Sequence, residues 1–420
     1  MCKHSTNEKT WYNGKKYRLA NFFDQWWDIY KQLPKEYITP EQYKAVNAIR
    51  VCRTEALGVD YYVCPECGEI TKVYHSCKNR FCPTCSWQDT LKWADRIKGQ
   101  MMSIPHRHTV FTLPHQLNAL IKDNKYELLS VLMRTSADTI KEWMKYKHNL
   151  KPGIISVLHT FGETKEYHVH THMIVSWGGL DIKTKKMKQI KGEYVNYDFL
   201  KNKFRRKFEK ELTAMFNKGT LEHHFSDSIK FQQFLNKLNK KKWNIHLEKP
   251  MDIPTQVVRY IGRYSKRACL SEYKITSMEG ENIKFRYKDN KTKDVNKKPI
   301  ERELELNYRD FFPRLLQHVP LPYFRLVRYY ATYSNRISIP QEYIYKETEQ
   351  SETEISENEA PENWENLQIK KTGQNPLICS YCQKRKIYMY TKLKSRYQNK
   401  ATIFRREIEG ENVFRKQNAA

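Results

Sequence analysis

The chain has 420 residues, of which 39% are hydrophobic, so it is long enough for two or three domains and too apolar for a disordered protein. Lys and Arg number 75 against 47 Asp and Glu, which gives a net charge of +28, and 13% of the residues are aromatic. Cations that neutralise phosphates, together with rings that stack on unpaired bases, favour a nucleic acid as the partner over a merely soluble basic surface.

The sequence contains no apolar run near the ~18 residues that a membrane span requires, and MCKHSTNEKTWYNGKKYR lacks the apolar core of a signal peptide. We therefore expect an intracellular protein with no membrane partner. In a reducing compartment, ten cysteines that include two neighbouring CxxC pairs indicate a metal site rather than disulfides.

Residues 1–98 are predicted to form a helical, zinc-binding and DNA-binding domain. Apolar residues at helical spacing from 17 to 53 predict two or three helices before a cysteine-rich segment. The pattern is helical again from 90 to 100.

The cysteine-rich segment CPECGEITKVYHSCKNRFCPTC contains two CxxC pairs with fourteen residues between them. Because each CxxC turn brings two sulfurs to one ion, this spacing predicts a single structural zinc with four thiolate ligands. The predicted ligands are Cys64, Cys67, Cys82 and Cys85.

Other residues in this region leave alternatives open. His75 and Cys77 lie between the two pairs and could replace a predicted ligand. Lys78 and Arg80 are among several basic residues here, which favours a module that binds nucleic acid over a pure scaffold. The later pair Cys379-x2-Cys382 has no second pair nearby and stays unassigned.

Residues 99–345 are predicted to form an α+β domain. A β-branched and aromatic run between prolines predicts a strand at 109–113, followed by one or two helices at 117–146. Two strand-like runs with a polar turn between them predict an antiparallel hairpin at 153–162 and 167–179. The further predicted elements are helices at 198–217, 228–239 and 254–267 and a strand at 283–287. This order favours a central antiparallel sheet flanked by helices.

The remaining chain is divided by its charge. The stretch 347–365 has eight glutamates and no basic residue, so residues 346–366 are expected to be an acidic linker. Residues 367–420 are expected to form a basic C-terminal tail.

The sequence EYHVHTHMIVS gathers three histidines at alternate positions of the second hairpin strand. Alternation places His168, His170 and His172 on one face, where two imidazoles can chelate one divalent cation. His159 falls roughly opposite His170 and is a candidate third ligand. Two or three histidines with open positions suit a cation that polarises a phosphate oxygen, although the cluster could instead be a packed, histidine-rich hairpin.

The sequence VVRYIGRYSKR places Tyr260 and Tyr264 on one face of the predicted helix. Such a pair is common in ordinary packing, but beside a phosphate-polarising metal a tyrosine hydroxyl is a candidate covalent nucleophile. Neighbouring cations would hold the phosphate and favour the phenolate: Arg259, Arg263, Lys266 and Arg267.

These features, in this order, resemble the two-tyrosine HUH transposases of bacterial rolling-circle insertion sequences, the insertion-sequence ninety-one family. The blocks that carry the resemblance are SCKNRFCPTC, HTVFTLP, GIISVLHTFG, HVHTHMIV, RYIGRYSKR and NYRDFFPRLLQHVPLPYFRLVRYYATYSNR. The resemblance implies an N-terminal zinc-binding transposase domain followed by an HUH-endonuclease domain, in a protein of the bacterial cytoplasm and nucleoid.

Site roles follow from the resemblance by position. The metal-binding His-x-His motif corresponds to His170 and His172, with Mg²⁺ or Mn²⁺ as the implied metal. The middle residue of that motif is normally hydrophobic and is Thr171 here, so the register His168–His170 remains an alternative. Tyr260 would be the first nucleophile and Tyr264 the second.

The implied activity is cleavage and rejoining of single-stranded DNA at element ends and target through a 5′-phosphotyrosine. Two alternatives differ in outcome. One is an HUH replication initiator or relaxase, which shares the nicking chemistry. The other is a non-catalytic, zinc-dependent nucleic-acid-binding protein, which would form no covalent adduct with DNA.

Overall fold

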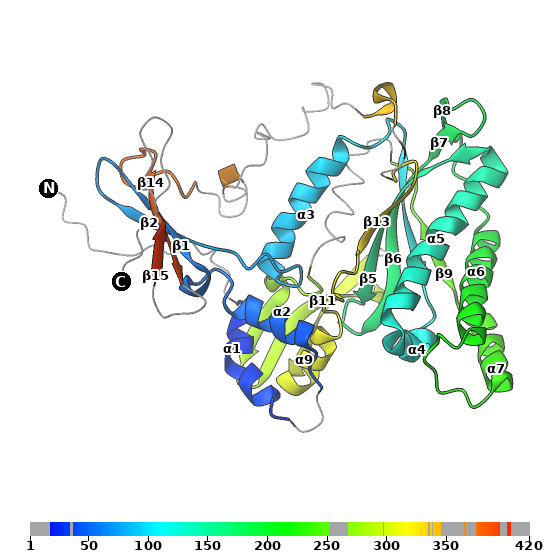
Figure 1. Cartoon of the computed structure of the whole chain (residues 1–420), viewed down its shortest axis with the longest axis horizontal. Helices are drawn as coiled ribbons and strands as arrows, with labels where there is room; N and C mark the ends of the chain where they lie inside the picture. Colours follow the sequence, from blue (N-terminus) through cyan, green and yellow to red (C-terminus); the bar gives the residue numbers. More distant parts are fainter. Residues whose placement is uncertain are drawn as a thin grey trace.

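The computed structural model describes residues 17–33, 37–251, 268–296, 298–334, 337, 339–345, 365–366, 369 and 375–394, and the backbone of 401–404. The described chain forms a mixed α/β protein whose sheets are antiparallel and flanked by helices (Figure 1). This confirms the predicted α+β class. Within the described residues no helix has the length and apolarity needed to cross a bilayer.

A five-stranded antiparallel sheet forms the centre of the right-hand half of the molecule in Figure 1. Its strand order is β13-β5-β6-β3-β9. The strands are β3 (His106–Thr112), β5 (Gly153–Phe161), β6 (Tyr167–Ser176), β9 (Asn244–Leu247) and β13 (Val327–Ala331). The predicted hairpin is β5 and β6, and the strand predicted at 109–113 is β3.

Helices cover one face of this sheet (Figure 1). They are α4 (Asn118–Asp123), α5 (Lys125–His148), α6 (Tyr197–Asn217) and α7 (Ser228–Asn239), all close to their predicted ranges. Buried residues such as Leu132 and Phe204 pack there against Val169 and Met173 of β6. A small sheet lies beside them, formed by β4 (Leu150–Lys151), β7 (Gly178–Asp181) and β8 (Met187–Gln189).

The opposite face of the sheet receives α3 (Pro83–Lys98). Trp93 and Ile97 of this helix form a hydrophobic cluster with Ile155 and Ile174 of the hairpin. The apolar contact covers part of this face.

A second core joins the start of the chain to a much later segment. It contains α1 (Leu19–Tyr30), α2 (Pro40–Arg50), β10 (Ile275–Glu279), β11 (Asn282–Lys293), β12 (Pro299–Asn307) and α9 (Tyr308–Leu316). Phe23 stacks on Phe312 with ring centroids 5.0 Å apart, and both rings are completely buried. Helix α2 begins with a capping box between Thr39 and Gln42. This lobe therefore joins the N-terminal helices to a segment that lies between strands β9 and β13 of the central sheet in sequence.

The third part is a four-stranded sheet at the left of Figure 1 with the order β15-β14-β1-β2. Its strands are β1 (Val59–Val63), β2 (Ile70–Tyr74), β14 (Ile387–Lys394) and β15 (Ala401–Phe404). Strand β14 pairs antiparallel with β1, so part of the basic tail returns to the N-terminal cysteine segment.

Candidate functional site

The hairpin brings three histidines together on the face of the central sheet that α3 covers only in part. His159 of β5 pairs directly with His170 of β6, as the sequence predicted. His172 lies two residues further along the same face, and the three imidazoles offer ligand atoms that all lie within 4.8 Å of one another. The Nε2 atoms of His170 and His172 are 3.1 Å apart.

This geometry fits one metal ion. Two ligand atoms bound about 2.1 Å from a metal, at about a right angle, are about 3 Å from each other. His170 Nδ1 lies 2.9 Å from the carbonyl oxygen of His168 and donates to it, so its Nε2 keeps the lone pair that a metal needs. A hydrogen bond from the second ring nitrogen to a carbonyl is typical of histidines that bind metals.

His172 is held by a row of polar groups that the sequence did not predict. Its Nδ1 lies 2.8 Å from Nε2 of His108 on β3, and His108 Nδ1 lies 3.1 Å from a carboxylate oxygen of Glu248. The rings of His108 and His172 are also stacked, with an interplanar angle of 7°. If His172 donates from Nδ1, its Nε2 is left available to a metal. The alternate histidines of HRHTVF were the available sequence signal for His108, whereas Glu248 had none.

Burial sets the charge of the two central imidazoles. Desolvation lowers the pKa of His170 and of His172 well below the ordinary value, and the nearby His159 adds to the shift. Both rings are therefore neutral at neutral pH. Neutral imidazole is the form that binds a metal.

The other residues of the histidine strand have different surroundings. His168 is half-buried, lies outside the group of three and contributes its carbonyl oxygen to His170. Thr171 points to the opposite face and is completely buried in the core. These positions favour the register His170–His172 over His168–His170.

The structure divides the cysteines differently from the sequence prediction. Cys82 and Cys85 lie with Cys52 and Cys77, whereas Cys64 and Cys67 lie with Cys379 and Cys382. The single tetrad of Cys64, Cys67, Cys82 and Cys85 is therefore wrong for this fold, because strands β1 and β2 carry the first CxxC pair into a separate sheet. Cys77 was considered as an alternative ligand, but Cys52 was missed because a lone cysteine carries no spacing signal.

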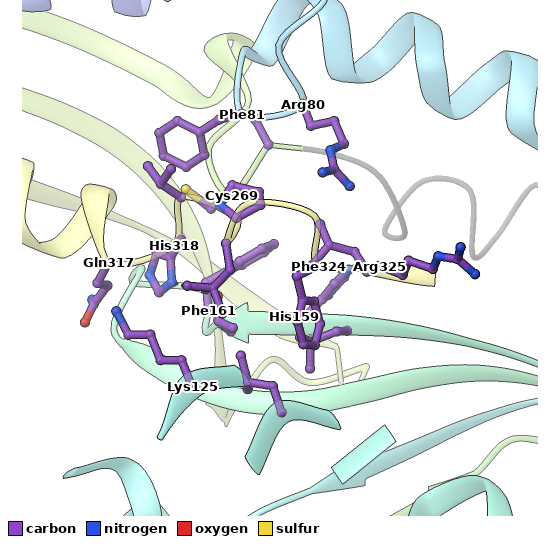
Figure 2. A pocket seen from close by; sticks show the side chains of 18 of the residues that line it. Arg80, Phe81, Lys125, His159, Phe161, Cys269, Gln317, His318, Phe324 and Arg325 are labelled. Atoms are coloured by element: carbon purple, nitrogen blue, oxygen red, sulfur yellow. Dashed lines mark hydrogen bonds between the residues drawn. The ribbon is translucent and has the colours of Figure 1, made fainter. Parts of the chain in front are cut away.

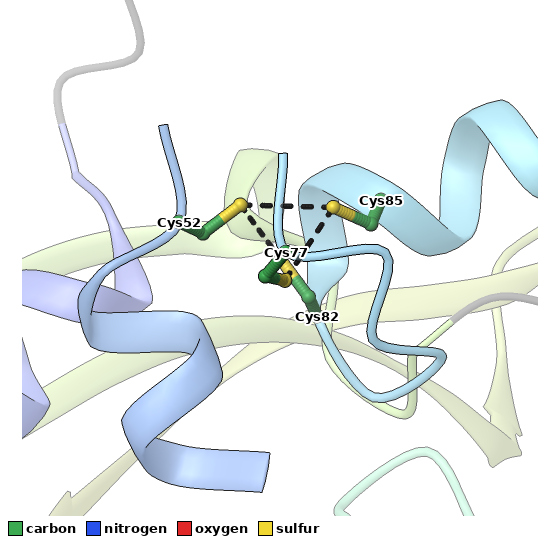
Figure 3. Close-up of side chains that lie close together, drawn as sticks. All are labelled: Cys52, Cys77, Cys82 and Cys85. Carbon is green, nitrogen blue, oxygen red and sulfur yellow. Dashed lines mark hydrogen bonds between the residues drawn. The ribbon is translucent and has the colours of Figure 1, made fainter. Parts of the chain in front are cut away.

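The first group of four lies in the second core (Figure 3). Its sulfur–sulfur distances are 3.6 Å for Cys52–Cys85, 3.6 Å for Cys77–Cys85 and 3.8 Å for Cys82–Cys52. Four sulfurs about 2.3 Å from a tetrahedral zinc are about 3.8 Å from one another, so the group matches a zinc site. Hydrogen bonding, first from the Cys52 thiol, lowers the pKa of Cys85 and favours a thiolate there.

A cavity of about 260 Å³ adjoins the histidine group (Figure 2). His159 lines it together with the aromatic rings of Phe161 and Phe324. Three cationic side chains also line it: Arg80 from the loop before α3, Lys125 from α5, and Arg325. The zinc-binding part of the chain and the central sheet thus share one cavity.

The remaining predicted site residues lie outside the described residues, except Lys78, which is exposed beside Cys77. They are Tyr260, Tyr264, Arg259, Arg263, Lys266 and Arg267. Of the described residues on either side, Ala268 lies near the site, whereas Met251 lies at the other end of β3. Met251 pairs with His106 of β3, and Ala268 lines the cavity and donates its N–H to Ser86 Oγ at 3.0 Å.

Two family models match the chain. One, described as "Transposase zinc-binding domain", matches residues 22–113, and the other, described as "Putative transposase", matches residues 153–340. The first range contains all four cysteines of the group in the second core. The second range contains the β5–β6 hairpin with its three histidines.

Two named proteins are similar over most of their lengths. "Putative transposase y4qJ" of Sinorhizobium fredii is 29% identical over 327 residues, which cover 76% of this chain and 80% of that protein. "Transposase for insertion sequence element IS801" of Pseudomonas savastanoi is 28% identical over 306 residues, which cover 70% of each. No solved structure matches the chain significantly.

Proposed function

Because this chain belongs to the insertion-sequence ninety-one family of transposases, we propose that it nicks and rejoins single-stranded DNA through a 5′-phosphotyrosine during rolling-circle transposition. The observation that supports this most is the convergence of His159, His170 and His172 beside a cavity lined by cations and aromatic rings. We place the activity in the bacterial cytoplasm, where the DNA substrate lies.

His170, His172 and His159 would hold a divalent cation, Mg²⁺ or Mn²⁺. When bound, such a cation polarises the scissile phosphate and stabilises its developing charge. The three imidazoles would hold the cation at the edge of the cavity, and Glu248 and His108 would keep His172 in the orientation that binding requires.

Tyr260 is proposed as the first nucleophile and Tyr264 as the second. The tyrosine oxygen forms a bond to phosphorus as the bond from phosphorus to the 3′ oxygen breaks, and a proton passes to that leaving oxygen to give a 3′-hydroxyl. The new ester conserves the energy of the broken bond, so rejoining requires no ATP. Support for this placement comes from Ala268, the described residue that directly follows the tyrosine segment, because it lines the cavity beside His159.

The cavity is proposed to hold a nucleotide next to the scissile phosphate. Phe161 and Phe324 offer faces for an unpaired base, while Arg80 and Arg325 offer charge for the backbone. An unpaired base can enter such a cavity, whereas a paired base cannot without leaving the duplex. Lys78 and the cations of the tyrosine segment would extend the contact with phosphates.

This function is tested by incubating the purified protein with labelled single-stranded oligonucleotides from element ends and with Mn²⁺ or Mg²⁺. A denaturing gel should show a covalent protein–DNA adduct that depends on the cation. His170→Ala with His172→Ala should reduce adduct formation by at least about 100-fold, the scale expected when metal ligands are lost.

The matched control is His224→Ala, because the side chain of His224 is 94% exposed and lies outside the group of three. It should leave the adduct yield unchanged. If the double variant formed adduct as well as the parent protein, the histidine site would play no part in the reaction.

A further inference from the structure

We propose that Cys64, Cys67, Cys379 and Cys382 form a second tetrathiolate zinc site, in which the metal fastens the C-terminal segment to the N-terminal cysteine sheet. Neither family model covers the whole group, since the zinc-binding match contains Cys64 and Cys67 but both matches end before Cys379 and Cys382. The inference does not depend on the proposed DNA cleavage. Its support comes from sulfur geometry, backbone geometry and the pairing of the two segments.

The sulfur geometry is that of a compact tetrad. Cys64 lies 3.4 Å from Cys382, and Cys67 lies 3.5 Å from Cys379, in each case between Sγ atoms. Cys382 is also 3.5 Å from both Cys67 and Cys379. These distances lie near the roughly 3.8 Å edge of a zinc tetrahedron and far above the roughly 2.05 Å of a disulfide bond.

The two CxxC turns have the same backbone geometry although their sequences differ. In the first turn, the Cys64 N–H donates to Glu69 O at 2.9 Å and the Gly68 N–H donates to Cys64 O at 2.9 Å. In the second, the Cys379 N–H donates to Lys384 O at 2.8 Å and the Gln383 N–H donates to Cys379 O at 3.1 Å.

The residue after the second cysteine is left-handed in both turns, with φ of 74° at Gly68 and 56° at Gln383. A left-handed conformation is unfavourable for a residue with a Cβ atom, so Gln383 requires compensation. Two such turns facing each other present four sulfurs to one ion, which is how paired CxxC turns bind zinc. Metal binding supplies that compensation at Gln383.

A buried ion pair adjoins the group. Lys386, which is 4% exposed, pairs with Glu69 beside Cys379. Its Nζ is 2.8 Å from Glu69 Oε2, and the same carboxylate oxygen is 3.0 Å from Cys379 Sγ. This ion pair joins the two segments, because Lys386 comes from the C-terminal segment and Glu69 from the N-terminal cysteine sheet, and it holds Glu69 against Cys379.

Strand pairing completes the connection. Strand β14 pairs with β1 from Val59↔Lys392 to Val63↔Ile387, and Tyr61 stacks on Tyr390 at 4.6 Å. Cys67 and Cys379 are 312 positions apart, so the metal would close a loop that contains the whole central sheet. Closing so long a loop strongly restricts the conformations of the unfolded chain, so a metal at this site would stabilise the folded protein.

The test is the zinc content of the full-length protein, measured by mass spectrometry. The wild type should hold two zinc ions per chain and the Cys379→Ser/Cys382→Ser variant should hold one. Cys269→Ser should keep two, because Cys269 belongs to neither group. Two zinc ions in the double variant would overturn the proposal.

A second measurement uses the wild type and does not depend on how the variant folds. Stepwise chelation followed by alkylation reports which cysteines become reactive when each zinc ion leaves. Cys64, Cys67, Cys379 and Cys382 should gain reactivity in one step, separately from Cys52, Cys77, Cys82 and Cys85. Release of Cys64 and Cys67 together with Cys82 and Cys85 would contradict the second site.

Discussion

At the scale of single residues, the orientation of one imidazole depends on side chains that never touch the proposed metal. His108 bridges His172 and Glu248, with contacts of 2.8 Å and 3.1 Å. A carboxylate at the end of such a row makes the ligating nitrogen more basic and keeps the ring in one orientation. Glu248 is therefore a positioning residue, and its effect should be seen in metal affinity.

We expect Glu248→Ala to weaken Mn²⁺ binding at the histidine site by about 10- to 100-fold, the usual effect of losing an outer carboxylate partner. The measurement is the Mn²⁺ concentration that gives half-maximal adduct formation, with zinc content followed in parallel. Zinc content should not change. Glu55→Ala, at an exposed position near the cysteine segment, is the control and should leave the Mn²⁺ requirement unaltered.

A second residue-scale prediction concerns pH and His318. Burial lowers the pKa of His318 to about 4, since the ring is only 7% exposed, and the hydrogen bond from its Nε2 to the Lys165 carbonyl oxygen opposes only part of this shift. In the unfolded chain the imidazole takes up a proton near its ordinary pKa of about 6.5, whereas in the folded protein it stays neutral down to about pH 4. Its contribution to the free energy of unfolding is therefore complete above pH 6.5 and is lost as the pH falls toward 4. The loss should be about 2 kcal/mol at pH 5.

Urea unfolding of the wild type and of His318→Gln at pH 7.5 and pH 5 measures this contribution. The variant should lose less stability between the two pH values than the wild type, by about the stated amount. Comparing the two proteins removes the contribution of thiolate protonation at the cysteine groups. Equal losses would show that His318 is not buried in its neutral form.

At the scale of elements, the β5–β6 hairpin separates a metal-binding face from a core face. His170 and His172 share one side with His159, whereas Val169, Thr171 and Met173 point to the helices. The Thr171 hydroxyl is buried and has no hydrogen-bond partner within the part of the chain that the structure describes. A hydrophobic residue would therefore suit this position in the core better than threonine does.

We expect Thr171→Val to raise the free energy of unfolding by roughly 1 kcal/mol, because it removes a buried hydroxyl that lacks a partner while keeping the shape of the side chain. Chemical denaturation measures this change. The Mn²⁺ requirement should stay the same, since the side chain faces away from the imidazoles. A loss of stability would indicate that the hydroxyl has a partner in solution.

The hairpin also shows how much the sequence predicted. Alternation alone placed the histidines on one face and gave the pairing of His159 with His170, because strand periodicity is local. The row from His172 through His108 to Glu248 could not be predicted in this way. Its members come from three separate segments of chain that only the folded sheet brings together.

At the scale of the whole molecule, the main contacts join segments that are far apart in sequence. Phe23 packs on Phe312, and β1 pairs with β14, so the N-terminal lobes are completed by one segment between β9 and β13 and by another after β13. The local CxxC spacing suggested one zinc site, but spacing cannot reveal that a pair such as Cys379 and Cys382 meets partners more than 300 residues earlier. Long-range pairing, not local pattern, determines the two groups of cysteines.

The central claim is that a tyrosine of the 260–264 segment becomes joined to the 5′ end of the cut strand. It is tested most directly with one oligonucleotide labelled at its 3′ end or at its 5′ end and incubated with protein and Mn²⁺. The account predicts that the 3′ label stays on the protein while the 5′-labelled fragment is released with a 3′-hydroxyl. The adduct should be lost in Tyr260→Phe/Tyr264→Phe and kept in Tyr323→Phe, whose side chain is 95% exposed. A 5′ label on the protein, or an adduct that persists in the double variant, would contradict the account.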